Sequence, residues 1–202
     1  TEIQSVTGEV DIEDLIPVEE CVLTMTNFGY VKRQKADDYH QQKRGGRGVN
    51  GMNRRDEDVA TEMFVTGSHD YVMFFSTLGR VYKLKCYEIP EGSRTSKGMN
   101  IANLLPITAE EKVTSMIRVP EFDEEKYLVM VTRNGTVKRL PVSTLKNIRA
   151  SGIRALRMDE GDQLISVRET DGTRKILIAT HDGQAICCLL YTSPSPRDLS
   201  TS

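Results

Sequence analysis

Hydrophobic and polar positions along the chain follow a pattern that recurs four times. In each copy a short apolar run reaches a turn that ends in glycine, and a second, more polar run follows the turn. The key glycines are Gly29, Gly79, Gly135 and Gly183, which lie 50, 56 and 48 residues apart. A period near fifty residues is typical of propellers and other arrays of small β-units. The pattern therefore predicts such an array.

Each repeat has the chemistry of a β-hairpin. Asn134-Gly135 and Asp182-Gly183 are strong signals for a type I′ turn, which needs positive φ at both central positions. Phe28-Gly29 and Leu78-Gly79 are weaker versions of the same signal. The predicted hairpins cover residues 22–33, 72–83, 128–139 and 176–186.

Two further strands accompany the hairpins. A third strand is expected before each later hairpin, over Val59–Val65, Val113–Val119 and Leu164–Val167. A fourth, short strand is expected near Gly48-Val49, Gly98-Met99 and Gly152-Ile153. Four strands match the size of one propeller blade. The fold is therefore predicted to be all-β and propeller-like, with single helical turns at Glu13–Ile16 and Ser143–Lys146.

The two ends of the chain depart from the repeat. Residues 1–20 are acidic and mixed, and they are expected to lead into the first strand. Residues 187–202 resemble the translated read-through of a sequencing-library adapter, or else a flexible Pro/Ser tail. The folded domain is expected to span residues 1–186. A start at Thr1 without methionine indicates a fragment, and neither a secretory leader nor an apolar run of about 18 residues is seen.

The charge distribution changes the picture that net charge suggests. The formal net charge of −2 at first argues against a nucleic-acid partner. Three windows, 29–55, 79–100 and 133–157, nevertheless hold 20 of the 27 lysines and arginines but only 4 of the 29 acids. Equivalent windows stacked side by side would form a basic rim and leave an acidic one. Because the surface field steers a polyanion, this distribution favours binding to nucleic acid.

The strongest candidate for binding chemistry is a heptad in the first window. It places three cations and three glycines in seven residues, so that planar guanidinium groups and bare backbone N–H groups can face phosphates. Its members are Gln42, Lys43, Arg44, Gly45, Gly46, Arg47 and Gly48. The cations expected to join them are Lys32, Arg33, Lys35, Arg80, Lys83, Lys85, Lys138, Arg139, Lys146 and Arg149. Contacts of this kind position a duplex without reading its bases.

Catalytic and metal-binding patterns are not found in the sequence. Gly46-Arg-Gly48-Val-Asn-Gly51 matches a dinucleotide motif by accident, because no helical pattern follows it. The three histidines, His40, His69 and His181, are scattered at turns and are expected at the surface. Cys21 and Cys86 are expected to be reduced, since no C-x-x-C pair exists. The chain is therefore expected to carry no catalytic site and no metal site.

The heptad and the repeat together resemble the C-terminal domain of the A subunit of bacterial DNA gyrase, a type IIA topoisomerase. The heptad is similar to the family's GyrA box, with Lys43 where the common form has arginine. The segments Gly29–Arg33 and Gly48–Met52 also resemble the family. The resemblance covers roughly residues 1–186. The related topoisomerase IV protein has similar blades but typically lacks an intact box, which favours gyrase.

This resemblance implies a six-bladed β-pinwheel, of which the chain holds about four blades, the last incomplete. It implies non-sequence-specific wrapping of DNA around a basic perimeter, which supports ATP-dependent negative supercoiling by the parent enzyme. The family's catalytic tyrosine lies in another part of the gyrase A protein, and ATP and magnesium act through the gyrase B protein, so this chain is expected to hold no cofactor. The implied partners are double-stranded DNA, the gyrase B protein and a second copy of the gyrase A protein, in the cytoplasm on the chromosome and away from membranes.

Three other functions fit parts of the pattern. The chain resembles the topoisomerase IV C-terminal domain, as noted above. A propeller that binds protein partners is expected to expose aromatic loops, but this chain has no tryptophan and its rim is cationic. An enzyme with a central channel is expected to cluster histidines or carboxylates at strand starts, and the sequence has no such cluster.

Overall fold

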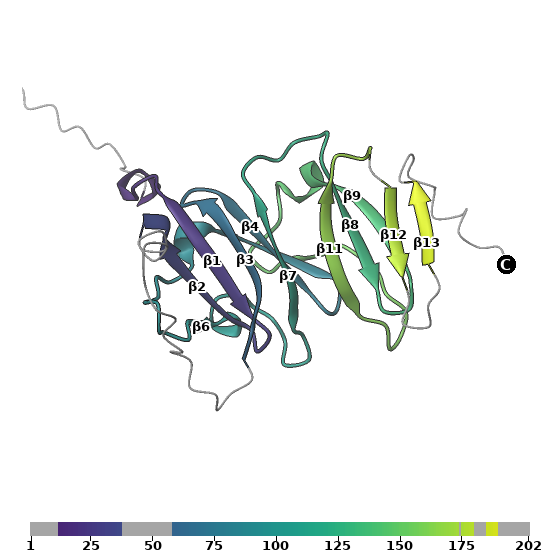
Figure 1. The fold of residues 1–202 in the computed structure, drawn as a ribbon, viewed down its shortest axis with the longest axis horizontal. Coiled ribbons are helices and arrows are strands. Elements are labelled where there is room, and N and C mark those ends of the chain that lie inside the picture. Colours follow the sequence, from purple (N-terminus) through teal and green to yellow (C-terminus); the bar gives the residue numbers. More distant parts are fainter. Residues whose placement is uncertain (1–11, 38–57, 174, 180–184, 190–202) are drawn as a thin grey trace, which may run out of the picture. The chain divides into compact units, whose positions relative to one another are not determined.

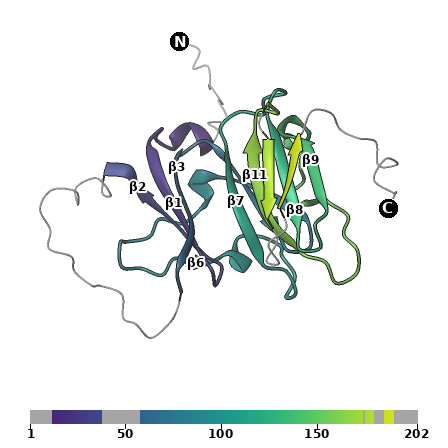
Figure 2. The same cartoon turned by 45° about the vertical axis from the view of Figure 1, so that its right-hand side comes forward.

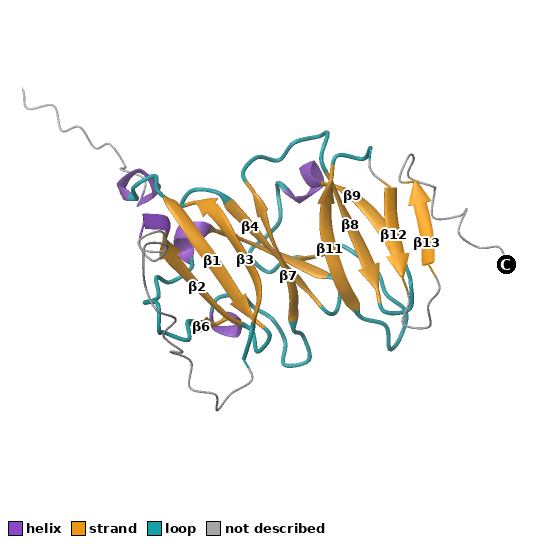
Figure 3. Ribbon diagram, viewed as in Figure 1, coloured by secondary structure: helices purple, strands orange, loops and turns teal. Residues whose placement is uncertain are grey.

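The predicted all-β class is confirmed. The computed structural model describes residues 12–37, 58–173, 175–179 and 185–189, and strands dominate this part of the chain (Figures 1 and 3). The strands are β1 (Glu20–Thr26), β2 (Tyr30–Lys35), β3 (Ala60–Gly67), β4 (Tyr71–Ser76), β5 (Arg80–Lys85), β6 (Met99–Asn100), β7 (Val113–Val119), β8 (Tyr127–Thr132), β9 (Val137–Pro141), β10 (Ile153–Arg154), β11 (Leu164–Thr170), β12 (Lys175–Ala179) and β13 (Ala185–Leu189). Within these ranges no helix is long and apolar enough to cross a membrane.

The strands form separate antiparallel sheets in two compact units. One unit takes its described residues from 1–70 and 85–100, and it holds the sheet β3-β1-β2-β6. The other takes its residues from 71–84 and 101–202, and it holds the sheets β10-β5-β4-β7, β11-β8-β9 and β12-β13. The first two sheets each have the four strands expected of one blade.

Sheet membership does not follow chain order. The third strand pairs with the hairpin before it, so β3 runs beside β1 (Figure 2). In the same way β7 pairs with β4. The short fourth strand pairs with the hairpin of the preceding sheet. β6 comes after β5 in the chain but pairs with β2, and β10 comes after β9 but pairs with β5. Neighbouring repeats therefore exchange a strand.

The predicted type I′ turn at Asn134-Gly135 is wrong. Val131 pairs with Val137, and the N–H of Thr132 donates to the carbonyl of Thr136, so the loop contains three residues. The Thr132 carbonyl accepts from Gly135 N–H and its hydroxyl from Thr136 N–H, while Gly135 has a φ of 90°. This is the geometry of a three-residue hairpin loop that ends in a left-handed glycine.

The same turn recurs in the first two hairpins. Thr26 and Ser76 occupy the position of Thr132, and each hydroxyl accepts the N–H four residues later. Their carbonyls accept from the N–H groups of Gly29 and Gly79. In these three hairpins a hydroxyl residue before the turn therefore accepts the N–H that follows the loop.

In the first three hairpins, apolar side chains of the first strand form the cores together with side chains of the neighbouring strands. In the first unit Cys21, Leu23, Met25 and Val31 are buried, because alternate positions of β1 and β2 share one face. In the second unit one cluster joins β4, β7, β8 and β11. It contains Met73, Phe75, Val81, Val119, Leu128, Met130, Val142, Leu145, Ile148, Ala155, Leu156, Leu164 and Val167.

Four short 3₁₀ turns connect the strands within the described ranges. Two were expected, and they appear as η1 (Ile12–Leu15) and η4 (Val142–Leu145). The other two, η2 (Cys86–Glu88) and η3 (Ile101–Asn103), have no periodic signal in the sequence.

β13 extends three residues past the predicted domain end at Ile186. It reaches Leu189, with Lys175 paired to Leu189 and Leu177 paired to Cys187. The backbone groups of 187–189 join the ladder of β12, although their sequence departs from the repeat. The rest of the predicted tail, residues 190–202, lies outside the described residues.

Candidate nucleic-acid interface

The heptad Gln42–Gly48 lies outside the described residues, as do His40 and His181. Its role in binding stays a prediction from the sequence. The structure does describe the ten other cations that are expected to act with the heptad. Eight of them lie on β2, β5 and β9. These strands are the more polar half of the first three hairpins.

Lys32 on β2 makes an unusual set of contacts. Its ammonium donates to the carbonyl oxygens of Ser93, Arg94 and Ser96, at 3.3, 3.0 and 3.1 Å. An ammonium has three donors, and three carbonyls accept them here. Partial burial lowers the pKa of Lys32 from its ordinary value. Direct phosphate contact by Lys32 stays a prediction, and the structure shows that it holds the segment after Gly92.

Arg33 and Lys35 share Glu19 at the start of the first sheet. Arg33 lies 3.8 Å and Lys35 3.6 Å from the Glu19 carboxylate. Arg33 also donates to the Ile89 carbonyl at 3.0 Å, and only 14% of its side chain is exposed. Lys35 is the more exposed of the two and is better placed to meet a polyanion.

The cations of β5 contact the segment that follows β9. An Arg80 guanidinium nitrogen donates to Ser151 O at 2.9 Å, and the Lys83 ammonium donates to Lys146 O at 2.5 Å. Lys83 also lies 4.8 Å from the centroid of the Tyr71 ring, a cation–π distance. Both side chains therefore hold a basic connection in place.

Lys85 belongs to an ion cluster with the N-terminal turn η1. Its ammonium lies 3.0 Å from Glu13 and 3.2 Å from the His69 carbonyl, while His69 Nδ1 lies 3.4 Å from Glu13. The Lys85 ammonium, followed by His69, lowers the pKa of Glu13. His69 was expected to be an ordinary surface residue. It is half-buried instead, and its Nε2 is 2.9 Å from the Ile16 carbonyl.

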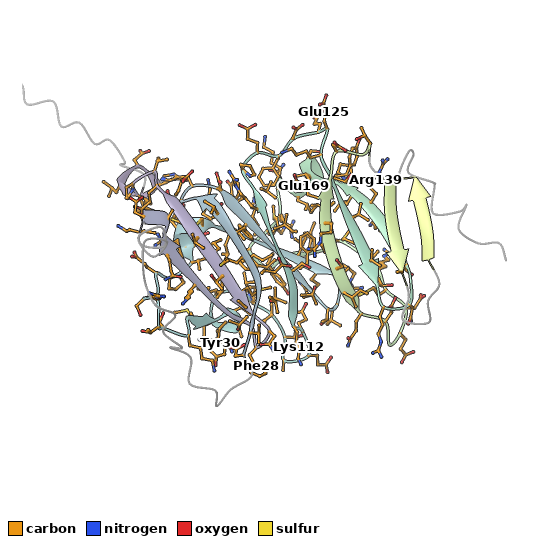
Figure 4. The ribbon with its side chains drawn as sticks, in the orientation of Figure 1. Phe28, Tyr30, Lys112, Glu125, Arg139 and Glu169 are labelled. Atoms are coloured by element: carbon orange, nitrogen blue, oxygen red, sulfur yellow. The ribbon has the colours of Figure 1, made fainter. Side chains whose placement is uncertain are left out.

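The third sheet repeats this arrangement. Lys138 on β9 donates to the Ala155 carbonyl at 2.7 Å. The guanidinium of Arg139, which is labelled in Figure 4, lies 4.4 Å from the Tyr127 ring centroid, a cation–π distance. Lys146 and Arg149, in the segment between β9 and β10, are exposed. The structure thus places the predicted cations on equivalent strands and connections, and contact of any of them with DNA stays a prediction.

Three buried acids were missed by sequence reasoning. Asp58, Glu111 and Asp162 each lie two residues before a third strand, and each is at least nine-tenths buried. Asp58 accepts from Phe28 N–H at 3.1 Å and Asp162 from Asn134 N–H at 3.0 Å. All three lie outside the three basic windows, and they bind groups of the hairpin turns. Their spacings of 53 and 51 residues were the available signal.

Glu111 makes the fullest set of these contacts. Its carboxylate accepts from the Ser76 hydroxyl at 2.9 Å, the Tyr82 hydroxyl at 3.0 Å and Thr108 N–H at 2.8 Å. Burial alone would raise the pKa of Glu111, but these hydrogen bonds lower it below its ordinary value. Burial and then Glu111 raise the pKa of Tyr82 to about 12. The three acids join turns to strands, which is a structural role.

Neither the cysteines nor the acids form a reactive constellation in the described residues. Cys21 and Cys86 are buried free thiols, and burial raises the pKa of Cys86 to about 12, so little reactive thiolate forms at neutral pH. The described ranges hold no group of three histidine, cysteine or acidic residues suited to a metal ion. Among the described residues, the cations of β2, β5 and β9 therefore stay the main candidates for binding a ligand.

Sequence comparison places the repeat in a known family. The family described as DNA gyrase C-terminal domain, beta-propeller, matches residues 22–66, 70–120 and 126–171. This chain belongs to that family. The three matched stretches begin and end close to the three repeats seen in the structure, because each contains one hairpin and the strand that follows it.

Named relatives agree with this assignment. The DNA gyrase A protein of Clostridium acetobutylicum is 46% identical over 186 residues, which is 92% of this chain but 22% of the relative. The chain therefore spans about a fifth of the relative's length. A solved C-terminal domain of DNA topoisomerase IV is 28% identical with a TM-score of 0.71, and the match covers 85% of this chain and 52% of that domain. A DNA gyrase A C-terminal domain, at 23% identity and a TM-score of 0.61 over 84% and 54%, supports the fold alone.

Proposed function

We propose that this gyrase C-terminal domain binds double-stranded DNA without reading its sequence and wraps it around a basic perimeter. The observation that carries the proposal is the recurrence of cations on the second strand and following connection of successive gyrase-family repeats. Phosphate contacts of this kind supply salt-dependent affinity that does not depend on base sequence. Bending a site of 20–30 base pairs costs about 1–6 kcal/mol, which many such contacts offset.

In the parent enzyme this wrapping supports ATP-dependent negative supercoiling. The partners there are the gyrase B protein and a second copy of the gyrase A protein, and the chain acts in the cytoplasm on the chromosome. ATP and magnesium act through the gyrase B protein, and this chain contributes the DNA path rather than a cofactor site. The heptad Gln42–Gly48 anchors the wrap, and the cations of β2, β5 and β9 and their connections extend it.

A linking-number experiment tests the proposal. Nicked circular DNA is bound by the chain, religated with the protein in place, deproteinised, and compared with DNA religated without protein. We expect a positive shift in linking number, because the resemblance to the gyrase family implies a right-handed wrap, which ligation traps. Arg44→Ala with Arg47→Ala is expected to abolish the shift while much of the affinity remains, since other cations still bind phosphate.

The matched control is Arg54→Ala with Arg55→Ala. It removes the same charge from the same basic window but leaves the heptad intact, so the shift is expected to persist. Equal loss of wrapping and affinity in the heptad variant would overturn the anchoring role. Absence of salt-dependent DNA binding by the unmodified chain would overturn the proposed function itself.

The topoisomerase IV C-terminal domain gives a second candidate function. The observation in its favour is the TM-score of 0.71 to that domain. On this alternative the chain holds DNA without trapping a positive wrap. Salt-dependent binding with an unchanged linking number would support it.

A further inference from the structure

Residues 12–19, here called the N-terminal strap, precede β1 and lie against cations that are predicted to bind DNA. The Glu19 carboxylate lies 3.8 Å from a guanidinium nitrogen of Arg33 and 3.6 Å from the Lys35 ammonium. Arg33 and Lys35 belong to β2, the second strand of the first hairpin. Two cations at the end of this strand therefore share one carboxylate of the strap.

The second paired carboxylate of the strap belongs to Glu13 in η1. One of its oxygens lies 3.0 Å from the Lys85 ammonium and 3.4 Å from Nδ1 of His69. The hydrogen bond from Lys85 is the largest cause of the lowered pKa of Glu13, which is therefore ionised at neutral pH. Lys85 lies fifty residues after Lys35, so the strap pairs with the same position of two successive repeats.

Polar contacts attach the strap to the turn that follows β3. The Ser68 hydroxyl donates to the Pro17 carbonyl at 2.8 Å, and Glu19 N–H donates to that hydroxyl at 3.1 Å. Ser68 N–H donates to the Glu19 carbonyl at 2.9 Å. The Nε2 atom of His69 lies 2.9 Å from the Ile16 carbonyl oxygen. Hydrogen bonds and ion pairs therefore hold the strap along its length.

The apolar side chains of the strap add little to this attachment. Ile12, Leu15 and Val18 are 76%, 72% and 85% exposed, and no residue of η1 is buried. Buried apolar area is the main resistance to separating packed segments, whereas an exposed ion pair contributes little. A segment with few buried apolar contacts belongs to the low-stability end of a fold. The strap is therefore held by contacts that another anion can replace.

A DNA duplex is an anion suited to this replacement. It carries one negative charge per about 1.7 Å of its axis, so it presents a far denser charge than two carboxylates do. Only 14% of the Arg33 side chain and 18% of the Lys85 side chain are exposed while the strap is in place. Because strap carboxylates lie against these cations, phosphates reach the same atoms only after the carboxylates leave.

We propose that the N-terminal strap is an autoinhibitory segment, in which Glu13 and Glu19 occupy cations of the DNA surface until a duplex displaces them. The proposal rests on the proposed function and deepens it, because it adds regulation of the same surface. In the free chain the strap neutralises Arg33, Lys35 and Lys85 and so lowers the affinity for DNA. In the complex these cations contact phosphates, and the strap leaves the turn after β3.

Removing the two strap charges tests the proposal. Glu13→Gln with Glu19→Gln is expected to bind a mixed-sequence duplex of about 30 base pairs about three- to tenfold more tightly than the unmodified chain. The matched control is Asp14→Asn with Glu20→Gln, which removes the same charge from neighbouring positions. Both control residues are exposed, and neither joins an ion pair within the described ranges. The control is expected to gain less than about twofold, and equal gains would overturn the inhibitory role.

Hydrogen exchange of the strap gives a readout that a general loss of charge repulsion would not change. Peptides that cover residues 12–19 of the unmodified chain are expected to exchange faster when the duplex is bound, because Glu19 N–H loses its partner on Ser68. A segment that DNA simply covers exchanges more slowly in the complex. Unchanged or slower exchange of residues 12–19 would therefore overturn the displacement of the strap.

Failure of this inference is distinguishable from failure of the proposed function. Equal gains in the two double variants, with salt-dependent binding and a positive linking-number shift by the unmodified chain, would overturn the strap alone. No salt-dependent binding by the unmodified chain would overturn both. Urea unfolding shows whether each variant folds. If the strap variant does not fold, hydrogen exchange of the unmodified chain still decides whether DNA displaces the strap.

Discussion

At the scale of single residues, polar side chains that the sequence pattern predicts to be solvent-exposed instead make contacts that stabilise the fold. Lysines on the second hairpin strands bind carbonyls of distant connections, and three buried acids bind turn amides and hydroxyls. Glu111 is the fullest example among the acids. Its carboxylate accepts hydrogen bonds from Ser76 at a turn, Tyr82 on β5 and Thr108 before β7. Removing one member of such a network leaves buried partners unpaired.

Replacing Glu111 with glutamine is expected to lower the free energy of unfolding by about 1–3 kcal/mol. The amide keeps the shape of the side chain but loses the charge, and one of its ends is a donor facing groups that donate to it. Urea unfolding monitored by circular dichroism measures the change. Glu110→Gln is the control, because Glu110 is exposed. Equal stability of the two variants would contradict the role assigned to Glu111.

The stability of the chain is also expected to fall in acid through Glu111. Its pKa is lower in the folded state than in the unfolded chain, where it is about 4.3. The contribution is therefore complete above that value and is lost as the pH falls through the folded pKa. Urea midpoints measured between pH 7 and about 3 should decline less steeply for Glu111→Gln. A parallel decline in both proteins would show that other groups dominate.

At the scale of the element, the hairpin turn is the recurring part. In the first three hairpins the turn combines a hydroxyl residue, Thr26, Ser76 or Thr132, with a left-handed glycine three residues later. The sequence predicted the hairpins and, in the first three, the glycine that ends the turn, because these are local signals. Gly183, in the fourth hairpin, lies outside the described residues. The sequence did not predict the three-residue loop, because the hydroxyl that completes the turn lies outside the dipeptide that signals it.

Alanine substitution at two of these glycines distinguishes the cost of backbone strain from the cost of a crowded Cβ. Gly135 has a φ of 90° and open space where a Cβ would lie, whereas at Gly79, with a φ of 73°, a Cβ would lie 2.6 Å from the Leu156 carbonyl oxygen. Gly135→Ala is expected to cost about 1–2 kcal/mol for the left-handed conformation. Gly79→Ala is expected to cost about 2–4 kcal/mol, because overpacking is added. Equal urea midpoints would contradict the close approach.

At the scale of the whole molecule, equivalent positions of the repeat differ in burial. Met63 on β3 and Met116 on β7 occupy the same place, five residues after the buried acid of their repeat. Met63 is 55% exposed, and Met116 is 2% exposed. Val65, also on β3, is exposed as well. Terminal faces of repeat arrays are atypical in this way, since each repeat buries its apolar face against a neighbour.

This difference predicts unequal costs for the same substitution. Met116→Ala is expected to destabilise the chain by about 2–5 kcal/mol, because it leaves a cavity among buried side chains. Met63→Ala is expected to change stability by less than about 0.5 kcal/mol. Urea unfolding of the two variants side by side makes the comparison. A large effect of Met63→Ala would mean that this face is covered in solution.

The sequence by itself determined the all-β class, the hairpins and the clustering of cations, because turn chemistry, alternation and charge are local properties that a fifty-residue repeat makes visible. The heptad and the family resemblance were also visible in the sequence alone. Only the tertiary structure decided which sheet each strand joins, because β6 and β10 pair with hairpins of earlier repeats. It alone decided that Lys32 holds the loop after Gly92 and that Glu111 lies buried, because these contacts join residues 29 to 64 positions apart. Such pairings leave no mark in local sequence, since a lysine or glutamate has the same pattern whether it meets solvent or a distant carbonyl or hydroxyl.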